Sequence, residues 1–495
     1  PYGGRPWQQG RWEMSRRVVG PFNRVEGDLE VQLEIDGDRV AGAQVVSPLY
    51  RGFEQMLQGR DPYDALVYVP RICGICSVSQ SVAAAQAIAA IQGVASPRNG
   101  ELAGNLILAN ENVADHLTHF NMFFMPDFAR EVYRKEPWFE AAHRRFKAVE
   151  GRAASEALKA RADFLHLMGL LAGKWPHSLA LQPGGTTRAV EVQEKVRIRS
   201  ILFAFRQFLE VSLFGDSLEN VIALDSVQAL DAWRERDAPQ SSDLRHFLHI
   251  AEALELEKLG RATDQFMSYG VYAVEGQRLF RGGVWDGSFA PVDQTGIAED
   301  VSHAWMHQQN GPKHPFHGAT LPSMEIPGAY TWCKAPRLDG RVMEVGALAR
   351  QVVDGHPLVR ELVAQSGGNV RNRVIARLLE IALVVVEMDS WAKELQPKEP
   401  FCHHAPMPQE GQGFGMIEAA RGSLGHWMRI KKGRILNYQI IAPTTWNFSP
   451  RDAQGVPGAL EQALVDAPVR TGEVDPVAVQ HIVRSFDPCM VCTVH

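Results

Sequence analysis

The sequence predicts an α+β protein that is predominantly α-helical, with a large multi-helix bundle core, an N-terminal β-hairpin and small β elements. The helical segments at 101–124, 153–171, 190–214 and 369–395 run well past the usual helix length, and such lengths are typical of a bundle. Two Cys-x-x-Cys motifs lie at opposite ends of the chain. If they form one site, the fold must bring both ends together at the core.

The N-terminal elements are predicted from alternation and capping. Apolar residues alternate over 29–35, Asp36-Gly37 makes a turn, and 40–46 returns, which indicates a β-hairpin. We expect a short helical stretch from 50 onward. Ser77 is predicted to cap an Ala-rich helix that ends near residue 92, so the first cysteine motif lies on the loop entering this helix.

The C-terminal part is irregular and β-like. Strands are predicted at 427–430 and 435–441, around a turn at Lys432-Gly433. The long apolar stretch at 374–388 contains Arg377, Glu380 and Glu387, so it is expected to form a buried helix rather than a membrane span.

Length and composition limit the domain organisation. The 495 residues exceed what one simple core usually supports. We therefore divide the chain into an N-terminal extension or expression remnant at 1–13 and a single unit at 14–495. Within this unit we expect an N-terminal β/α part at 14–70, a helical core at 71–410, and a C-terminal part at 411–495.

Composition and cysteine usage limit the function classes. The net charge of −6 gives no basic excess for nucleic acid or a membrane surface. Residues 1–13 lack the apolar core of a signal peptide. Thiols at Cys-x-x-Cys spacing fit a reducing compartment, so a cytoplasmic location is expected.

The four paired cysteines, Cys73, Cys76, Cys489 and Cys492, are the candidate metal ligands. Two intervening residues let both sulfurs of a motif face one metal, and a tetrathiolate set suits zinc, nickel or iron. A structural zinc site is the alternative to a redox centre. The Cys402-His403-His404 run is expected to be an ordinary loop.

Seven motifs, in the order found in the family, resemble the large subunit of nickel-iron hydrogenases from Met14 onward. They are Arg24-Val25-Glu26-Gly27, Arg71-Ile72-Cys73-Gly74-Ile75-Cys76, Asp115-His116 with His119-Phe120, Lys334-Ala335-Pro336-Arg337, Ala420-Arg421-Gly422-Ser423-Leu424, Pro443-Thr444-Thr445-Trp446-Asn447 and Asp487-Pro488-Cys489-Met490-Val491-Cys492. The resemblance implies an oxidoreductase that splits dihydrogen into protons and electrons.

The resemblance also implies the ligand set of the centre. All four paired cysteines would hold nickel, and Cys76 and Cys492 would also bind an iron that carries carbon monoxide and two cyanides. Arg421 would lie beside the cyanides with Leu424, Pro443 and Thr444 nearby as cofactor-binding residues. Asp115 and Asp487 would orient Arg421.

Two further functions follow from the resemblance. Glu26 would relay a proton beside the thiolate of Cys489, which suits a partly buried carboxylate with a raised pKa. Glu54, the backbone near Ile440 and His495 would form a magnesium site, although an imidazole is an unusual ligand for so hard an ion. The family's C-terminal extension is cleaved after the position of His495, so the sequence resembles a mature form.

The cysteine count implies a partner. Beyond the four site cysteines only Cys333 and Cys402 remain, and these cannot ligate an iron-sulfur cluster. The electrons must therefore leave through a small subunit that carries iron-sulfur clusters. The family pattern implies an obligate heterodimer, associating as a dimer of heterodimers.

Three positions depart from the pattern of energy-converting members. Ile75 replaces a valine, Phe123 a leucine and Gln80 a histidine. The two larger side chains would narrow the gas channel against dioxygen, and Gln80 would replace a titratable donor near a bridging thiolate. Together they resemble oxygen-tolerant regulatory hydrogenases of low turnover, which sense hydrogen and signal to a histidine protein kinase.

The sequence leaves two alternatives to a regulatory hydrogenase. One is a catalytic cytoplasmic uptake hydrogenase that feeds electrons to respiration. The other is a relative without hydrogenase activity, such as the quinone-site subunit of respiratory complex I, which lacks the four cysteines. Their presence here argues against it.

Overall fold

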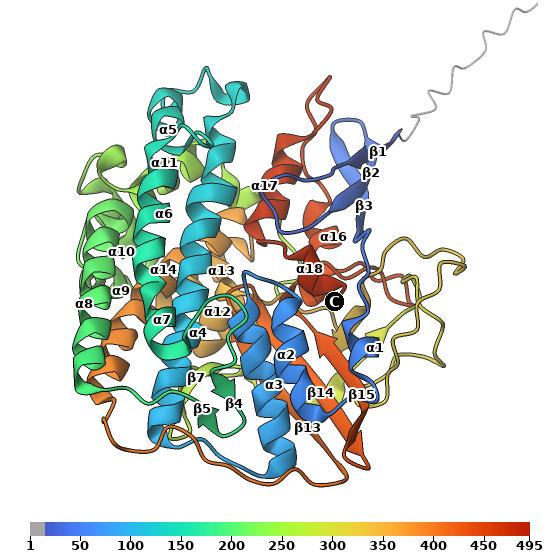
Figure 1. Cartoon of the computed structure of the whole chain (residues 1–495). Helices are drawn as coiled ribbons and strands as arrows, with labels where there is room; N and C mark the ends of the chain where they lie inside the picture. Colours follow the sequence, from blue (N-terminus) through green and yellow to red (C-terminus); the bar gives the residue numbers. More distant parts are fainter. Residues whose placement is uncertain (1–14) are drawn as a thin grey trace, which may run out of the picture.

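The structure is a computed structural model, and residues 15–495 of it are described here. The predicted extension at 1–13 lies outside this part. Long helices gather on one side of the molecule and short antiparallel sheets on the other (Figure 1). The predicted α+β class with a helical core is confirmed. The division of 14–495 into three parts stays a prediction.

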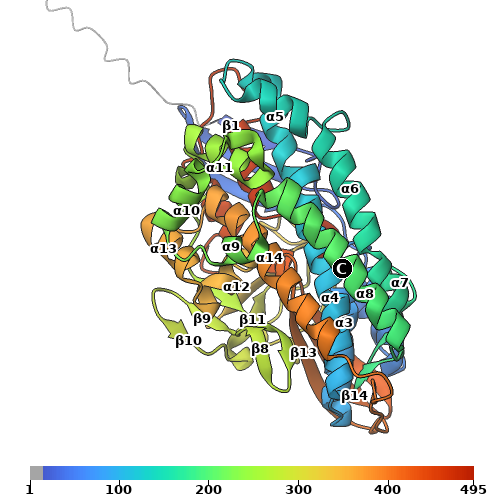
Figure 2. The same cartoon turned by 90° about the vertical axis from the view of Figure 1, so that its left-hand side faces the viewer.

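The bundle is built on four long helices: α4 (Arg98–Thr118), α6 (Arg152–Phe164), α8 (Val192–Phe208) and α14 (Val370–Glu394). α14 packs against α4 and α8, and α6 packs against α4 and α8. Figure 2 shows α4, α8 and α14 running side by side.

The central helix α14 carries charged side chains in the core. Arg373 pairs with Glu344 at 2.8 Å, and Glu380 pairs with Arg350 at 2.7 Å. Partners of opposite charge reduce the cost of burying these groups. Within residues 15–495 no helix is both long and apolar enough to cross a membrane, which agrees with the buried helix expected here.

Three predicted helices end differently from the expectation. The segment at 153–171 forms two helices, α6 and α7 (His166–Ala172), that meet at Leu165. α4 and α8 stop early and continue as π-helical turns, η3 (His119–Phe124) and η6 (Leu209–Phe214). No glycine or proline marks these changes, and a π-helical turn preserves the apolar pattern of a helix, so the sequence did not reveal them.

Two of the three three-stranded antiparallel sheets in the described residues contain strands predicted from the sequence. The predicted hairpin is confirmed as β2 (Glu30–Asp36) and β3 (Arg39–Val46), and β1 (Ser15–Val19) adds an unpredicted strand beside β2. The C-terminal strands are β14 (Gly422–Lys431) and β15 (Arg434–Ile441), which pair with each other, and β13 (Gly411–Ala419), which pairs with β14. α3 (Ser77–Gln92) packs on β13 and β14.

Shorter elements complete the fold. The helices are α1 (Phe53–Leu57), α2 (Ala65–Tyr68), α5 (Phe139–Phe146), α9 (Leu218–Ile222), α10 (Val227–Glu235), α11 (Asp243–Ala253), α12 (Ala347–Asp354), α13 (Pro357–Ser366), α15 (Pro443–Asn447), α16 (Ala459–Leu464), α17 (Val477–Ser485) and α18 (Met490–Thr493). The strands are β4 (Leu181–Gln182), β5 (Gly185–Thr186), β6 (Phe266–Ser268), β7 (Val271–Val274), β8 (Gln277–Phe280), β9 (Gly283–Trp285), β10 (Phe289–Ala290), β11 (Ile297–Asp300) and β12 (Ala335–Leu338).

The two ends of the chain meet through backbone hydrogen bonds. Glu26 and Cys489 form a parallel bridge, and the Met490 N–H donates to the Glu26 carbonyl at 2.8 Å. Gly27 has a φ of +81°, and a Cβ there would lie 3.1 Å from the Val491 nitrogen. A glycine is therefore needed where the N-terminal segment meets α18, near the C-terminus in Figure 1.

Candidate metal centre

The four cysteines of the two motifs form one buried cluster. Their sulfurs all lie within 4.8 Å of one another, and all four thiols are free. Sγ of Cys76 is 3.0 Å from Sγ of Cys492, and Sγ of Cys489 is 3.5 Å from Sγ of Cys73. This arrangement confirms that the fold brings the two motifs together in the core.

The first motif is held at the start of α3. Cys76 is the N-cap residue of this helix and Ser77 its first residue, so the prediction that Ser77 caps the helix is wrong by one position. Glu111 of α4 acts in place of a capping side chain, because it accepts the backbone N–H groups of Val78 and Ser79, each at 2.9 Å. It thereby fixes the helix that carries Cys76.

The thiols do not ionise together in the protein alone. Hydrogen bonding to Cys489 and the other sulfurs holds the pKa of Cys73 well below its usual range and that of Cys76 well above it. Burial raises the pKa of Cys489 and Cys492. Four thiolates so close together require cations among them, so this donor set fits soft metal ions.

Arg421 lies in the turn between β13 and β14, and its guanidinium is held by two acids. It donates to Asp115 Oδ2 at 2.6 Å and Oδ1 at 3.2 Å, and to Asp487 Oδ1 at 3.1 Å and the Asp487 carbonyl at 2.9 Å. All three residues are buried. An arginine in a turn and an acid on a helix are usually solvated, so this burial distinguishes them from ordinary surface charges.

The charges around Arg421 are unevenly balanced. Burial opposes ionisation of Asp487, but Arg421 holds the pKa of this carboxyl below its usual value. Burial raises the pKa of Asp115 to about 8. The positive charge of Arg421 offsets this rise only in part, and the negative charge of Asp487 adds to it. The pKa of Arg421 itself is raised by its two acidic partners despite its burial.

Glu26 lies against the second motif. Its backbone bridges to Cys489, and its side chain is partly buried. Burial raises its pKa, the charge of Cys73 adds to this effect, and Arg421 and Arg51 oppose it. A raised pKa brings a carboxyl closer to the range in which it can both accept and release a proton.

The remaining cofactor-binding residues predicted from the sequence are also buried. Thr444 is the second residue of α15, and its Oγ1 accepts the backbone N–H of Cys489 at 3.1 Å. Its hydroxyl proton remains free to donate elsewhere, because one hydroxyl is both donor and acceptor. Pro443 begins α15, and Leu424 is buried in β14 without a hydrogen bond from its side chain.

The three positions that depart from the family pattern differ in placement. Gln80 on α3 is buried, and its Nε2 points to Sγ of Cys492 at 3.9 Å. Ile75 and Phe123 are each partly exposed. Phe123 lies in the π-helical turn η3, where its carbonyl accepts a hydrogen bond from Arg24 at 3.2 Å.

The residues predicted to bind magnesium also meet in space. Glu54 on α1 accepts the N–H of Ile440 at 2.8 Å and lies 3.1 Å from Nε2 of His495. The backbone at Ile440 therefore meets Glu54 through its N–H, and metal binding by the backbone near Ile440 stays a prediction. Lys334 also lies here, 3.4 Å from Glu54 and 2.8 Å from Glu299, so an ammonium already supplies positive charge.

The sequence assigned no role to three residues that hold the site, although Lys334 stands in one of the quoted motifs. Glu111, Trp175 and Lys334 contact the two clusters through buried side chains or hydrogen bonds. Glu111 precedes Asp115 by four residues on one apolar helix, and this spacing places both acids on the same face. That spacing could have revealed Glu111, whereas Trp175 comes from a distant loop and had no local signal.

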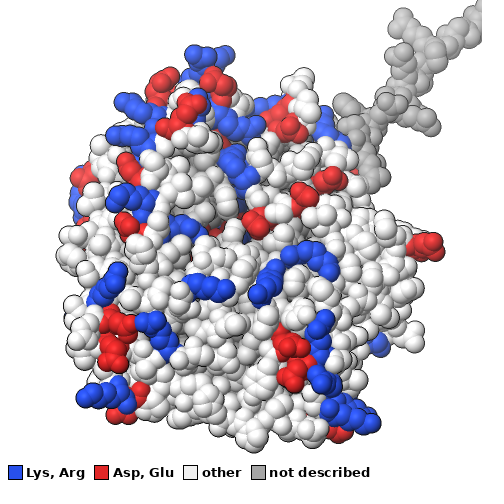
Figure 3. Space-filling model, in the orientation of Figure 1, with Lys and Arg blue, Asp and Glu red and all other residues white. Residues whose placement is uncertain are grey.

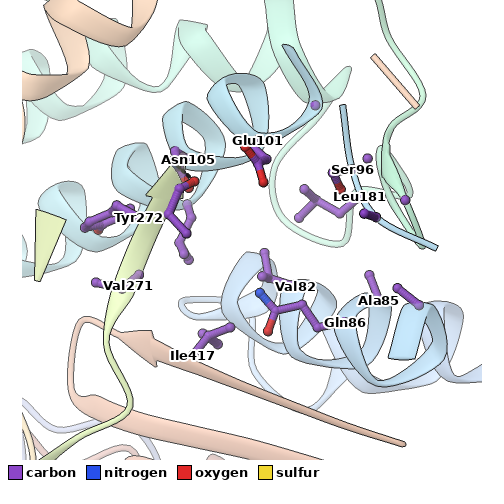
Figure 4. A pocket seen from close by; sticks show the side chains of 18 of the residues that line it. Val82, Ala85, Gln86, Ser96, Glu101, Asn105, Leu181, Val271, Tyr272 and Ile417 are labelled. Atoms are coloured by element: carbon purple, nitrogen blue, oxygen red, sulfur yellow. Dashed lines mark hydrogen bonds between the residues drawn. The ribbon is translucent and has the colours of Figure 1, made fainter. Parts of the chain in front are cut away.

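A cavity of about 450 Å³ lies elsewhere, between α3, α4, β7 and β13. Figure 4 shows Val82 and Gln86 from α3 opposite Glu101 and Asn105 from α4. None of the four cysteines lines it.

The face of the molecule in Figure 3 carries positive and negative side chains interspersed. This distribution agrees with the absence of a basic excess in the composition.

The fold and the cluster of buried thiols define a metalloprotein in which one centre joins both ends of the chain. Residues 51–133 and 153–495 match the model of the nickel-dependent hydrogenase family. The chain belongs to this family. Hydrogenases are oxidoreductases, so the prediction of an enzyme is confirmed.

Relatives cover almost the whole chain. The periplasmic [NiFeSe] hydrogenase large subunit of Desulfomicrobium baculatum is 29% identical over 520 residues, covering 96% of this chain and 94% of the relative. The uptake hydrogenase large subunit of Azotobacter chroococcum mcd 1 is 28% identical over 585 residues, covering 97% and 95%. The structure of the Ni-Fe-Se hydrogenase from D. vulgaris Hildenborough matches with a TM-score of 0.83 at 27% identity, covering 98% of this chain and 100% of that one.

These names favour the uptake alternative over the regulatory hydrogenase predicted first, and they lend no support to a kinase partner. One relative is described as periplasmic. The cytoplasmic location therefore stays a prediction.

Proposed function

We propose that this chain is the active-site subunit of a nickel-iron hydrogenase. The four thiolates would hold nickel, and Cys76 and Cys492 would share an iron carrying carbon monoxide and two cyanides. The observation that carries this proposal is the cluster of four buried sulfurs within 4.8 Å, in a chain of the nickel-dependent hydrogenase family. When bound, the centre supplies heterolytic cleavage of dihydrogen.

Glu26 accepts the proton that this cleavage releases. Its segment is bridged to Cys489, so the carboxyl stays beside the centre. Its raised pKa brings it nearer to neutral pH, which helps a carboxyl both to take up and to release a proton. The Glu26 side chain is only partly buried and can pass the proton outward.

Arg421 and Thr444 would hold the cyanide ligands of the iron. The guanidinium is fixed by four hydrogen bonds, three to the carboxylates of Asp115 and Asp487 and one to the Asp487 carbonyl. The positive charge of Arg421 is therefore held in place without reorganisation. Thr444 is fixed by accepting the Cys489 N–H. A fixed guanidinium and hydroxyl bind anions and exclude water from the same volume.

The electrons require a partner chain. Among the described residues, the only cysteines outside the cluster are Cys333, which is buried, and Cys402, which is partly exposed, and they join no metal-binding group. A small subunit with iron-sulfur clusters therefore completes the enzyme. The heterodimer, and a dimer of heterodimers, remain part of this proposal.

The physiological role we favour is hydrogen uptake, since one of the relatives is named for it. A regulatory role, with oxygen tolerance and a histidine protein kinase as partner, is the second candidate. It is favoured by Gln80, whose neutral amide points to Cys492, together with Ile75 and Phe123. Location follows the role, and fractionation of cells would separate cytoplasm from periplasm.

The cluster of Glu54 and His495 is proposed as a magnesium site. Oε1 of Glu299 beside it is buried without a hydrogen-bond partner among the described residues, so this oxygen fits a bound cation. Carboxylate oxygens suit magnesium.

One experiment tests the activity and separates the roles. We would purify the heterodimer, measure its nickel and iron content, record the infrared bands of bound carbon monoxide and cyanide, and follow hydrogen-dependent dye reduction. Absence of these bands in metal-loaded protein would overturn the proposal. Fast turnover supports uptake, whereas slow turnover that persists in air, and becomes air-sensitive in Ile75→Val/Phe123→Leu, supports sensing.

A further inference from the structure

Three polar side chains connect strand β15 to one sulfur of the cluster. The Tyr438 hydroxyl lies 2.7 Å from Nδ1 of His426 on β14. Nε2 of His426 lies 2.8 Å from Oε1 of Gln80 on α3, and Nε2 of Gln80 lies 3.9 Å from Sγ of Cys492. All four side chains are at most 2% exposed, so water cannot replace any of these contacts.

The protonation of His426 allows only two arrangements of this chain. The ring of His426 is buried between two neutral partners, the Tyr438 hydroxyl and the Gln80 amide, so the imidazole is neutral and carries one N–H. With the proton on Nε2, His426 donates to Oε1 of Gln80, and Gln80 turns its N–H group toward Cys492. With the proton on Nδ1, the amide must reverse, and its oxygen faces the sulfur.

The Tyr438 hydroxyl selects between these arrangements. A phenol is protonated near neutral pH, so the Tyr438 hydroxyl can donate its proton to Nδ1. Among the described residues, His426 is its only hydrogen-bond partner. Donation to Nδ1 places the imidazole proton on Nε2, and an amide oxygen facing a thiolate would be repelled.

We propose that Tyr438 and His426 are positioning residues that hold the amide N–H of Gln80 toward the sulfur of Cys492. The chain of donors then runs in one direction, from Tyr438 through His426 and Gln80 to Cys492. Donation to a metal-bound thiolate withdraws electron density from it and tunes the metals it binds. This inference rests on the proposed function, in which Cys492 is shared by two metals.

The infrared spectrum of the intact heterodimer tests this chain. Loss of the N–H donor leaves more electron density on sulfur and iron, which moves the carbon monoxide band to lower wavenumber. Gln80→Met should therefore shift the band downward, and Tyr438→Phe should shift it in the same direction by a smaller amount. The double variant should shift no further than Gln80→Met alone, because both changes act through one contact.

Tyr133→Phe provides a matched control. Tyr133 makes the same kind of buried contact, 2.6 Å from Nε2 of His481, but the recorded contacts of that pair lead to Asp127 rather than to a cysteine. The carbon monoxide band of the Tyr133→Phe variant should not move. Unchanged bands in Tyr438→Phe, or a double variant that shifts further than Gln80→Met, would overturn the inference. Absence of the bands in the unmodified heterodimer would instead overturn the proposed function.

Discussion

The cysteine cluster and the Glu54 cluster contrast within one fold. Each joins residues from both ends of the chain, through Cys76 and Cys492 in the first and Glu54 and His495 in the second. The cysteine cluster holds four ionisable sulfurs, with the cation Arg421 already committed to two aspartates. The second cluster contains its own cation, Lys334, between two glutamates.

This difference separates a site that requires metal from one that can exist without it. Lys334 offsets one of the two negative charges of Glu54 and Glu299, since its ammonium contacts both. No comparable cation lies among the thiols in the described part of the chain. A bound metal should therefore be essential to balance the charge of the cysteine cluster. At Glu54 it should add only modestly to the stability of the cluster.

The largest expected effect is the loss of a shared thiolate. Cys492→Ser should abolish hydrogen-dependent dye reduction and lower the nickel and iron content, because a hydroxyl is a poor soft-metal ligand. Cys402→Ser is the matched control, since Cys402 is partly exposed and outside the cluster. Full metal content in Cys492→Ser would contradict the assignment.

Removing the proposed proton acceptor should slow turnover without emptying the site. Glu26→Gln keeps the size of the side chain but cannot take up a proton, so turnover should fall by about 10²–10⁴-fold. Metal content and infrared bands should be retained. Glu34→Gln, an exposed acid on β2, should change nothing. Equal turnover in Glu26→Gln and the unmodified enzyme would exclude the relay.

The charge balance of the second cluster can be broken at Lys334. Lys334→Met leaves Glu54 and Glu299 buried together without a cation, which should lower the free energy of unfolding by about 3–5 kcal/mol. Urea unfolding of the heterodimer measures this loss, and added magnesium should recover part of it if the site binds the ion. Lys147→Met, which removes a partly exposed pair with Glu150, should cost about 0–1 kcal/mol. A similar small loss in Lys334→Met would show that the cluster is not balanced by this residue.

Acid should weaken the second cluster in a defined window. Although burial opposes it, Lys334 and His495 lower the pKa of Glu54 to about 2. The unfolded chain binds this proton at higher pH than the native protein, so the contribution is present above pH 4.5 and is lost as the pH falls toward 2. Between pH 5 and 3 the free energy of unfolding should fall by about 2 kcal/mol through this group. In Glu54→Gln this part of the decrease should disappear, and an unchanged pH profile would contradict the lowered pKa.

The sequence was sufficient to predict those elements and site residues that depend on a local pattern or motif. Alternation predicted the hairpin, and the helical period predicted the segments at 101–124 and 369–395. It also located the cysteines, Arg421 and the two aspartates, whose contacts depend on motifs of recognisable spacing. It could not identify Glu111 or Lys334 as parts of these clusters, because their partners come from elements far away in the chain.

The errors have the same physical origin. The break at Leu165 and the π-helical turns leave no mark in composition. Cys76 rather than Ser77 is the N-cap residue of α3, because the capping contacts come from Glu111 on another helix.

The separation of the two cysteine motifs also has a consequence during synthesis. Cys76 and Cys492 are 416 residues apart. A ribosome that adds about 5–20 residues per second needs roughly 20–80 seconds between the first pair and the second. During that time the first two thiols are available to any soft cation in the cell, including the wrong one. Correct metal loading therefore calls for either a protecting factor on the nascent chain or delivery of the metals after the ends have met.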